Sequence, residues 1–575
     1  MALTKTVTAC LVATLGCTVV QADLEAGFKA PPHEAKPHTW FHMMNGNVTK
    51  EGITRDFEAL AKAGIGGVQM FDAGCAIPPG GLDFNSPEWF DLFRHAASEA
   101  QRFGLEICIP NCSGWSSSGG PWNPPSNAMK RVTFRTTQVT GPKKISLKLP
   151  RETKDNGFYA DIGVFAFPTP AAEKTQLAGV TATVAPDGQS FTLASDKPFT
   201  LTGFSYKLAY PWSWSGDAAF AVEASDDGAT FRPLEKFNAM LGRSGANDHG
   251  VRFHALPKKM TVKALRAKIV SASVKTTILA PRAEATVKLS ALGAKTFELR
   301  QETKPDATPS TPDQVVAKGA VRDVTANMAA DGTFTWDAPA GDWTILRVGY
   351  RCTGKKNHPA SKFGVGLEVD KLSAEALDYH FEQYVGRLCR ELGSLAGAVE
   401  TGFNNILVDS YEVGSQNWTQ KMESEFLRRR GYSIRPFLPA FAGYVIDDVA
   451  TTERFLEDFR RVVADLFAEN YAGALAKKCH QYGLRLSLEP YGNCPADNLQ
   501  YANTPTFQWA SSGAREAHIS TIAGMRSSCP LSRTSGASGL SARSRSRRIL
   551  GRGRGAGRRR RSRSRRRATA PTRAA

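Results

Sequence analysis

The pattern of apolar and polar positions predicts two helix–strand units near the start of the chain. In residues 48–64, apolar side chains recur at helical spacing, and the apolar run 67–71 follows as a buried strand. In the second unit Ser86 and Pro87 are typical of a helix N-terminus, and Gly104 ends that helix. The apolar run 105–110 is then the second strand of the pair.

In the middle of the chain the spacing of apolar residues changes from helical to alternating. Segments such as 219–225 and 334–339 alternate apolar and polar residues and are flanked by turn residues, which predicts antiparallel strands. We interpret residues 129–352 as an inserted all-β region made of one or two β-sandwich modules.

Helices and strands alternate again after this insertion. Residues 374–392 and 452–482 show helical periodicity, whereas residues 405–412 and 484–492 are predicted strands. Strands that alternate with helices indicate a parallel sheet, and a (β/α)8-type barrel is the version we predict. The barrel would be incomplete, because no further helix–strand units can be recognised after residue 503.

The N-terminal segment has the pattern of an export signal. Lys5 precedes an apolar stretch over residues 7–20, and Val20-Gln21-Ala22 fits a small-x-Ala cleavage site. The sequence therefore predicts a secreted or periplasmic protein. No later stretch has the roughly 20 apolar residues that a membrane span needs. The predicted divisions are 1–22 (signal peptide), 23–128 and 353–503 (two parts of the barrel), 129–352 (insertion) and 504–575 (tail).

The net charge of +19 is concentrated in the tail. Residues 504–575 hold 18 arginines, no lysine and one acid, Glu516, so the preceding 503 residues carry only +2. The body therefore gives no reason to expect a nucleic acid as a specific partner. An RNA-binding protein that uses the Arg-Ser tail is the alternative favoured by composition alone. We predict that the tail is disordered, because dense like charge with few apolar residues cannot offset the ordering entropy.

Acidic and aromatic side chains follow several predicted strands. Asp72, the loop 111–115, the segment 409–412 and Glu489 all come at strand ends, where barrel enzymes hold their catalytic groups. Two carboxylates at neighbouring strand ends suit glycoside hydrolysis, in which one protonates the leaving oxygen and the other activates water or attacks the sugar. Three tryptophans have the flat rings that stack on sugars: Trp40, Trp115 and Trp418.

Long motifs in the same regions resemble glycoside hydrolase family 106, the α-L-rhamnosidases. The resemblance lies in residues 28–74, which include TWFHMMNG, in SPEWFDLFRHAASEAQRFGLEICIPNCSGWSSSGGPW, in LVDSYEVGSQNWT and in SLEPYG. It implies an exported hydrolase that removes terminal α-L-rhamnosyl groups from rhamnose-containing glycans with inversion, and that binds calcium.

The resemblance also implies roles for single residues. The acid-bearing motif of the family coincides with DSYEVG, which makes Glu412 the candidate general acid. EPYG places Glu489 in the pocket near the calcium ion, a hard cation that prefers oxygen ligands. The candidate substrate-binding residues are Trp40, His42, Asp72, Trp115, Asp409, Tyr411 and Trp418.

After EPYG the sequence departs from the family, which continues with motifs like DIPMGEFW and GAESFT. Residues 505–513 can be encoded by CCG ACA TTC CAA TGG GCG AGT TCT GGG. If a C precedes this stretch and every codon starts one base earlier, the translation is PDIPMGEFW. Residues 534–547, treated alike, read VWGKRIVGAESFT. We interpret this agreement as a frameshift close to Asn503.

The frameshift would remove two glutamates of the family. They would be encoded across the codons of Ala510 and Ser511 and across those of Arg543 and Ser544, and the second is the presumed general base. The sequence therefore predicts an inactive or impaired rhamnosidase. A carbohydrate-binding protein without catalysis, which uses the inserted region and the aromatic loops, is the alternative hypothesis.

Overall fold

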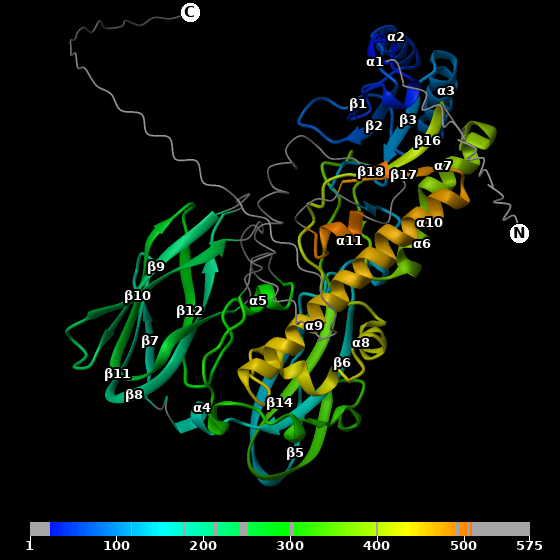
Figure 1. Ribbon diagram of the computed structural model, residues 1–575. Coiled ribbons are helices and arrows are strands. Elements are labelled where there is room, and N and C mark those ends of the chain that lie inside the picture. Colours follow the sequence, from blue (N-terminus) through cyan, green and yellow to red (C-terminus); the bar gives the residue numbers. More distant parts are fainter. Residues whose placement is uncertain are drawn as a thin grey trace, which may run out of the picture. The chain divides into compact units, whose positions relative to one another are not determined.

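A six-stranded parallel sheet positions the strand ends that the sequence analysis selected (Figure 1). The computed structural model describes residues 24–116, 118–175, 177, 179–211, 216–241, 251–298, 304–397, 401–489, 494–502 and 507–508. Neighbouring strands of the sheet run parallel throughout. In spatial order they are β1 (His38–Met44), β2 (Gly67–Ala73), β3 (Glu106–Pro110), β16 (Gly402–Val408), β17 (Arg485–Leu488) and β18 (Phe507–Gln508).

The first two helix–strand units form as predicted. Helix α2 (Lys50–Lys62) joins β1 to β2, and α3 (Pro87–Phe103) joins β2 to β3. Ser86 caps α3 by accepting a hydrogen bond from the backbone N–H of Trp89. Gly104 ends the helix in the left-handed conformation, with φ of 69°, which glycine adopts at little cost.

The two faces of the parallel sheet are covered by different parts of the protein. Val68, Met70, Ile107, Ile109 and the corresponding residues of β16 and β17 pack with the helices in one large apolar core. The alternating positions point to the opposite face, because successive side chains of a strand lie on opposite sides. That second face carries Trp40 and His42 of β1, and Asp409 follows β16 on the same face.

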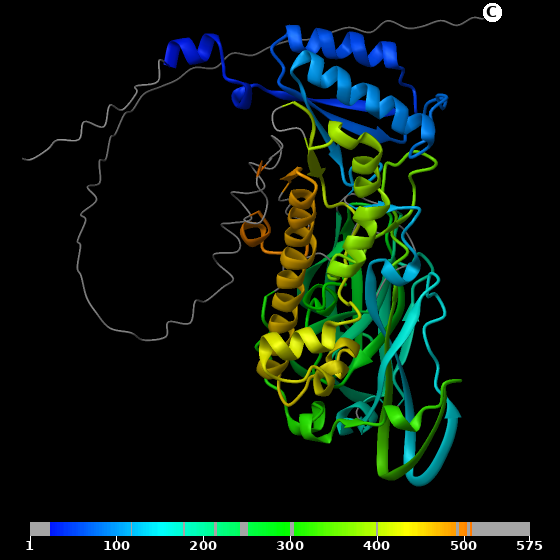
Figure 2. The ribbon, with the colours of Figure 1, turned by 90° about the vertical axis from the view of Figure 1, so that its right-hand side faces the viewer.

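The long predicted helices are interrupted. Residues 452–482 form α9 (Val449–Phe467), a π-helical stretch (Ala468–Gly473) and α10 (Ala474–Gln481), which follow one another in a single rod (Figure 2). Residues 374–392 form α6 (Ala374–Gln383) and α7 (Val385–Leu392), since Tyr384 departs from helical geometry between them. Between β16 and α9 lies the shorter helix α8 (Met422–Arg430).

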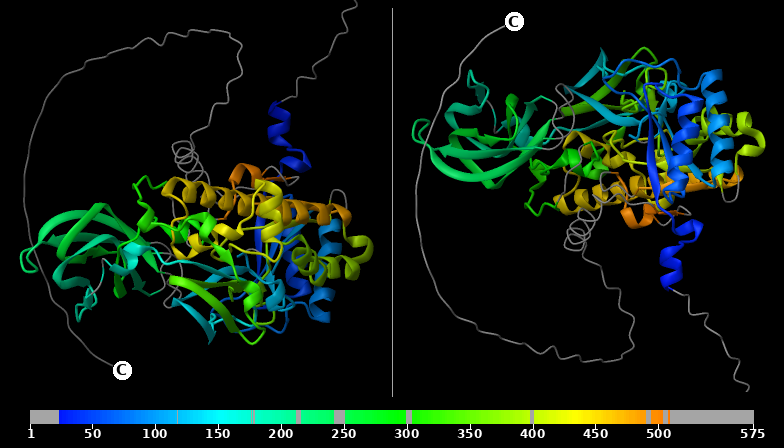
Figure 3. Two further views of the ribbon diagram at one scale, coloured as in Figure 1. Left: turned by 90° about the horizontal axis from the view of Figure 1, so that it is seen from below. Right: turned by 90° about the horizontal axis from the view of Figure 1, so that it is seen from above.

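The inserted region contains two antiparallel sheets, as its alternating pattern predicts. One has the strand order β13 (Arg322–Asp323), β6 (Tyr159–Pro168), β14 (Thr333–Cys352), β5 (Lys130–Lys148). The other consists of β10 (Arg232–Leu241), β9 (Gly216–Ser225), β11 (Arg252–Ala272), β8 (Ser190–Ala209) and β12 (Thr277–Glu284), with β7 (Thr181–Val184) paired to β8. The long strands of this second sheet curl around a separate apolar core (Figure 3).

The incomplete (β/α)8-type barrel predicted from the sequence appears only as a parallel sheet, and a barrel is not observed in the described residues. Within the described residues the parallel sheet is open, with β1 at one end and β18 at the other. Closure requires further strands that pair with both end strands, and in the described part of the chain none do so.

The prediction for the tail is wrong at one point. We expected residues from 504 onward to pack against nothing, yet Phe507 and Gln508 pair with Ser487 and Leu488 as strand β18. The rest of the tail and the predicted signal peptide lie outside the described residues. Among the described helices none is both long and apolar enough to cross a bilayer.

Candidate functional site

The carboxyl ends of the parallel strands gather the predicted acidic residues at one edge of the sheet. Asp409 directly follows β16 and Glu489 directly follows β17, and these two strands are neighbours. The backbone N–H of Glu489 donates to the carbonyl of Val408 at 2.9 Å, which extends the parallel pairing into the site. Both carboxylates therefore lie side by side on the face of the sheet away from the helices.

Three carboxyl groups share this edge. The side chains of Asp409 and Glu489 hydrogen bond to each other, and Glu412 lies close enough to act electrostatically on Asp409. Ser410 donates from Oγ to Oε2 of Glu489 at 3.3 Å. Asp409 and Glu489 are 8% and 3% exposed, so the pair is buried. The structure thus brings together the predicted acid and the predicted metal ligand.

The burial of this pair changes the protonation of Asp409. Removal of its carboxyl from water is the largest cause, and the adjacent carboxyl of Glu489 is the second, so that the pKa of Asp409 rises to about 8. Two carboxylates cannot both keep their charge at short range in a place with little water. Asp409 therefore keeps its proton at neutral pH.

Aromatic side chains gather on the part of the sheet formed by β1 and β2, two strands away from the carboxyl groups. Trp40 and His42 lie on β1, and their ring centroids are 5.5 Å apart. The ring of Trp115 lies 6.1 Å from His42 and 6.4 Å from Phe71. Trp40 is 52% exposed, which leaves its ring available to a ligand. Flat rings are suited to a sugar, whose C–H face packs on aromatic carbon.

Asp72 anchors loops. Its carboxylate accepts hydrogen bonds from the hydroxyls of Ser113 and Ser361, the latter at 2.6 Å, and its carbonyl accepts from the N–H of Gly114. Burial is the largest cause of the raised pKa of Asp72. The Asp72 side chain thus links the loop after β3 to the segment around Ser361 by hydrogen bonds, and its role is to hold these loops in place.

Two predicted substrate-binding residues are buried in the core. Trp418 is 1% exposed and packs near Tyr350 and Phe441, so the prediction that its ring stacks on a sugar is wrong. Tyr411 is 4% exposed, with its ring against Phe467. Apolar packing thus occupies the rings of both residues, and neither ring lies open to a ligand.

A buried ion pair supports the loop that contacts Glu412, and the sequence analysis missed it. Glu368 and Lys371 form an ion pair of 2.7 Å with both side chains fully buried. Glu368 accepts hydrogen bonds from the hydroxyl of Ser116 at 3.2 Å and from the N–H of Ser118 at 3.0 Å. The carbonyl of Ser116 in turn accepts from the N–H of Glu412 at 3.2 Å.

His358 completes this support. Its backbone N–H donates to Oγ of Ser116 at 2.8 Å, and its ring Nε2 lies 3.1 Å from the carbonyl of Glu412. These contacts could not be predicted from local sequence patterns, because Ser116 and Glu368 are 252 positions apart. Only the pairing of the segment around Glu368 with the loop after β3 brings them together.

His380 fixes the beginning of the same loop. Its ring Nε2 lies 2.9 Å from the carbonyl of Asn111, and Nδ1 accepts from Nε1 of Trp122 at 3.1 Å. Burial lowers the pKa of His380 to about 4, so the ring is neutral in the folded protein. A neutral ring fits this arrangement, since one nitrogen donates and the other accepts.

We expect His380 to make the protein sensitive to acid. The unfolded chain takes up a proton near pH 6.5, whereas the folded chain does so only near pH 4. The stability that this histidine contributes is therefore present above pH 6.5 and is lost as the pH falls toward 4. This amounts to about 3 kcal/mol, measurable by urea unfolding at pH 7 and pH 4.

The variant His380→Gln keeps a hydrogen-bonding side chain that does not titrate. We expect it to be less stable at pH 7 but to lose less stability on acidification. His480→Gln is the matched control, because His480 is exposed at the end of α10. Equal acid sensitivity of His380→Gln and the parent chain would contradict this prediction.

Comparison with known proteins places the chain in a family. Residues 29–544 match the family of glycoside hydrolases described as alpha-L-rhamnosidase, family 106. The chain belongs to this family. The structure of a rhamnosidase from Novosphingobium sp. PP1Y superposes with a TM-score of 0.71 and 28% sequence identity. A protein of Formosa agariphila named putative beta-glucuronidase is 36% identical over 483 residues.

This member of family 106 spans only part of the length of these two proteins. The alignments cover 84% of the chain in both cases, but 48% of the Novosphingobium rhamnosidase and 32% of the Formosa protein. The match confirms the resemblance predicted from the motifs around Trp40, Trp115, Glu412 and Glu489.

The calcium ion expected for family 106 can be tested against the side chains of this site. Asp409 and Glu489 supply carboxylate oxygens, the donors that calcium prefers. Calcium takes six to eight ligands, and among the described residues no group of three or more His, Cys, Asp or Glu side chains is arranged to hold a metal. The two carboxylates thus suit calcium in kind, and carbonyl oxygens or water would have to supply the other ligands.

Proposed function

We propose that this family-106 protein derives from a glycoside hydrolase that cleaves terminal α-L-rhamnosyl linkages in rhamnose-containing glycans with inversion. The observation that supports this most is the gathering of Asp409, Glu412 and Glu489 at one strand edge. Exposed aromatic rings lie on the same face of the sheet, and the family is that of alpha-L-rhamnosidases. Hydrolysis of α-L-rhamnosides by the chain with its frame restored tests the proposal.

In this mechanism Glu412 is the general acid. It protonates the glycosidic oxygen as the bond to the anomeric carbon breaks, while a second carboxylate activates water on the opposite face of the sugar. The backbone of Glu412 is held at two points, because its N–H donates to the carbonyl of Ser116 and its carbonyl lies 3.1 Å from Nε2 of His358. Trp40, His42 and Trp115 would pack against the sugar, and Asp409 would face its hydroxyl groups.

The second carboxylate is the one that we propose is missing. Residues 505–513 and 534–547 can be written in codons that read as family motifs when the frame is moved by one base, and the general base would then be the glutamate encoded across Arg543 and Ser544. Without that base the water is not activated, so the chain would be inactive or impaired. Carbohydrate binding without catalysis is the alternative function, and the exposed ring of Trp40 favours it.

We also propose that the protein is exported to the periplasm or secreted. The support for this is the apolar segment 7–20, which is followed by a small-x-Ala cleavage pattern. A glycan substrate outside the cell agrees with such a location.

We propose that Glu489, with Asp409 beside it, contributes ligands to a calcium ion. Addition of calcium is expected to raise the melting temperature, because a ligand at 100 times its Kd adds about 2.7 kcal/mol to stability. Differential scanning fluorimetry with calcium and with a chelator measures this. Glu489→Gln should abolish the rise, whereas Glu51→Gln, an exposed carboxylate of α2, should retain it. A melting temperature that does not respond to millimolar calcium would contradict the proposal.

A further inference from the structure

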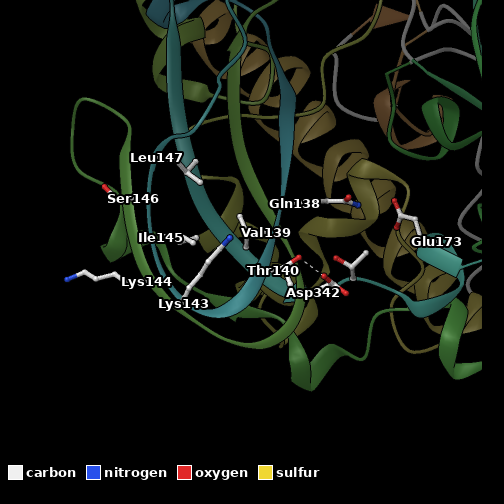
Figure 4. A pocket seen from close by; sticks show the side chains of 11 residues that line it. Gln138, Val139, Thr140, Lys143, Lys144, Ile145, Ser146, Leu147, Glu173 and Asp342 are labelled. Atoms are coloured by element: carbon white, nitrogen blue, oxygen red, sulfur yellow. Dashed lines mark hydrogen bonds between the residues drawn. The ribbon is translucent and has the colours of Figure 1, made fainter. Parts of the chain in front are cut away.

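A groove on the four-stranded antiparallel sheet has no role in the site described above. Strand β5 is the edge strand of this sheet, and its pairing with β14 is displaced by a bulge between Ala338 and Gly341. Bulges bend a strand and turn its side chains in new directions. The groove at this bend has a volume of about 640 Å³ (Figure 4).

The walls of the groove carry both hydrogen-bond donors and acceptors. Gln138 extends from β5 toward Glu173 of helix α4 (Ala171–Thr175), and Lys143 extends toward Thr140 (Figure 4). The hydroxyl of Thr140 donates to Asp342 at 2.6 Å, which fixes that carboxylate at the rim. Val139, Ile145 and Leu147 add apolar surface between these polar groups.

Within the described residues, one carboxyl oxygen of Glu173 has no hydrogen-bond partner. This atom, Oε2, is buried. Burial is the largest cause of the raised pKa of this carboxyl, and Lys288 offsets part of that rise. A buried carboxyl oxygen without a hydrogen bond costs free energy, so a ligand that supplies a donor gains affinity there.

We propose that this groove binds uncharged sugar residues of a glycan chain, at a second site separate from the carboxylates of the parallel sheet. A sugar presents hydroxyl groups that both donate and accept, together with apolar C–H faces, and the lining offers both kinds of contact. The lining holds two lysines, Lys143 and Lys144, and two acids, Asp342 and Glu173, so these side chains give the groove no large excess of positive charge that would select a polyanion. The volume exceeds one sugar ring and admits a short oligosaccharide.

Binding to the full chain tests this site. The probes are a neutral rhamnose-containing trisaccharide and a trisaccharide of the same length that contains a uronate, each measured by isothermal titration calorimetry. The double variant Gln138→Ala/Lys143→Ala should weaken binding of the neutral probe at least about tenfold, the loss expected when hydrogen bonds to a ligand are removed. Thr136→Ala/Lys148→Ala, at exposed positions of β5 outside the groove, should bind like the parent.

The outcomes separate this proposal from the proposed enzymatic function. Equal affinity of the two double variants, or preference for the uronate probe, would overturn the groove as a neutral sugar site. In the Glu412→Gln background, the added substitutions Gln138→Ala and Lys143→Ala should still weaken binding of the neutral trisaccharide, because the groove does not depend on Glu412. Absence of hydrolysis after the frame is restored would contradict the enzymatic proposal and leave the groove result unchanged.

Discussion

Restoring the reading frame after Asn503 is expected to raise the hydrolysis of α-L-rhamnosides by about 10²–10⁴-fold. A positioned general base contributes a factor of this size, and the glutamate that we assign to this role is encoded across the codons of Arg543 and Ser544. The described sheet is also open, with a two-residue strand at one end. Further strands would hold Asp409, Glu412 and Glu489 more firmly, so the gain can exceed that of the base alone. Measured kcat/KM values of the two chains give the ratio.

A control separates the base from the general effect of completing the fold. In the restored chain, replacement of the recovered glutamate by glutamine should return kcat/KM to near the value of the present chain, while the melting temperature stays that of the restored chain. If the present and restored chains turn over substrate equally well, either the frameshift or the assignment of the base is wrong.

The second large effect is expected for Glu412→Gln in the restored chain. Glutamine keeps the shape of the side chain but cannot protonate the glycosidic oxygen. Turnover of alkyl rhamnosides, which have poor leaving groups, should fall by about 10²–10⁴-fold. Nitrophenyl rhamnosides should be affected much less, because their leaving group departs without protonation. A comparison of kcat/KM for the two substrate classes measures the difference.

Two further variants sharpen this test. Glu51→Gln changes an exposed carboxylate on α2 and should leave both rates unchanged. Asp409→Asn matters more, since the raised pKa of Asp409, about 8, makes it a second group that holds a proton at neutral pH. Suppose that Asp409→Asn loses turnover mainly on substrates with poor leaving groups, while Glu412→Gln shows no such dependence. Asp409, and not Glu412, would then be the general acid.

Local sequence patterns were enough to predict individual helices and strands. The start of α3 could be predicted from Ser86 and Pro87 and its end from Gly104, because capping depends on neighbouring residues alone. Strands β2 and β3 were found from their apolar runs, since both faces of a parallel sheet's strands are covered. The break at Tyr384 between α6 and α7 was missed, because the apolar periodicity continues across it.

The sequence by itself determined the family motifs and the positions of the carboxylates at strand ends. Only the tertiary structure decided which side chains meet. It buried Trp418 in the core, where its ring cannot reach a sugar, and it paired Glu368 with Lys371 beneath the loop that contacts Glu412. It also placed Asp409 against Glu489 with little water between them, and this burial, which no local pattern encodes, determines the protonation of the site.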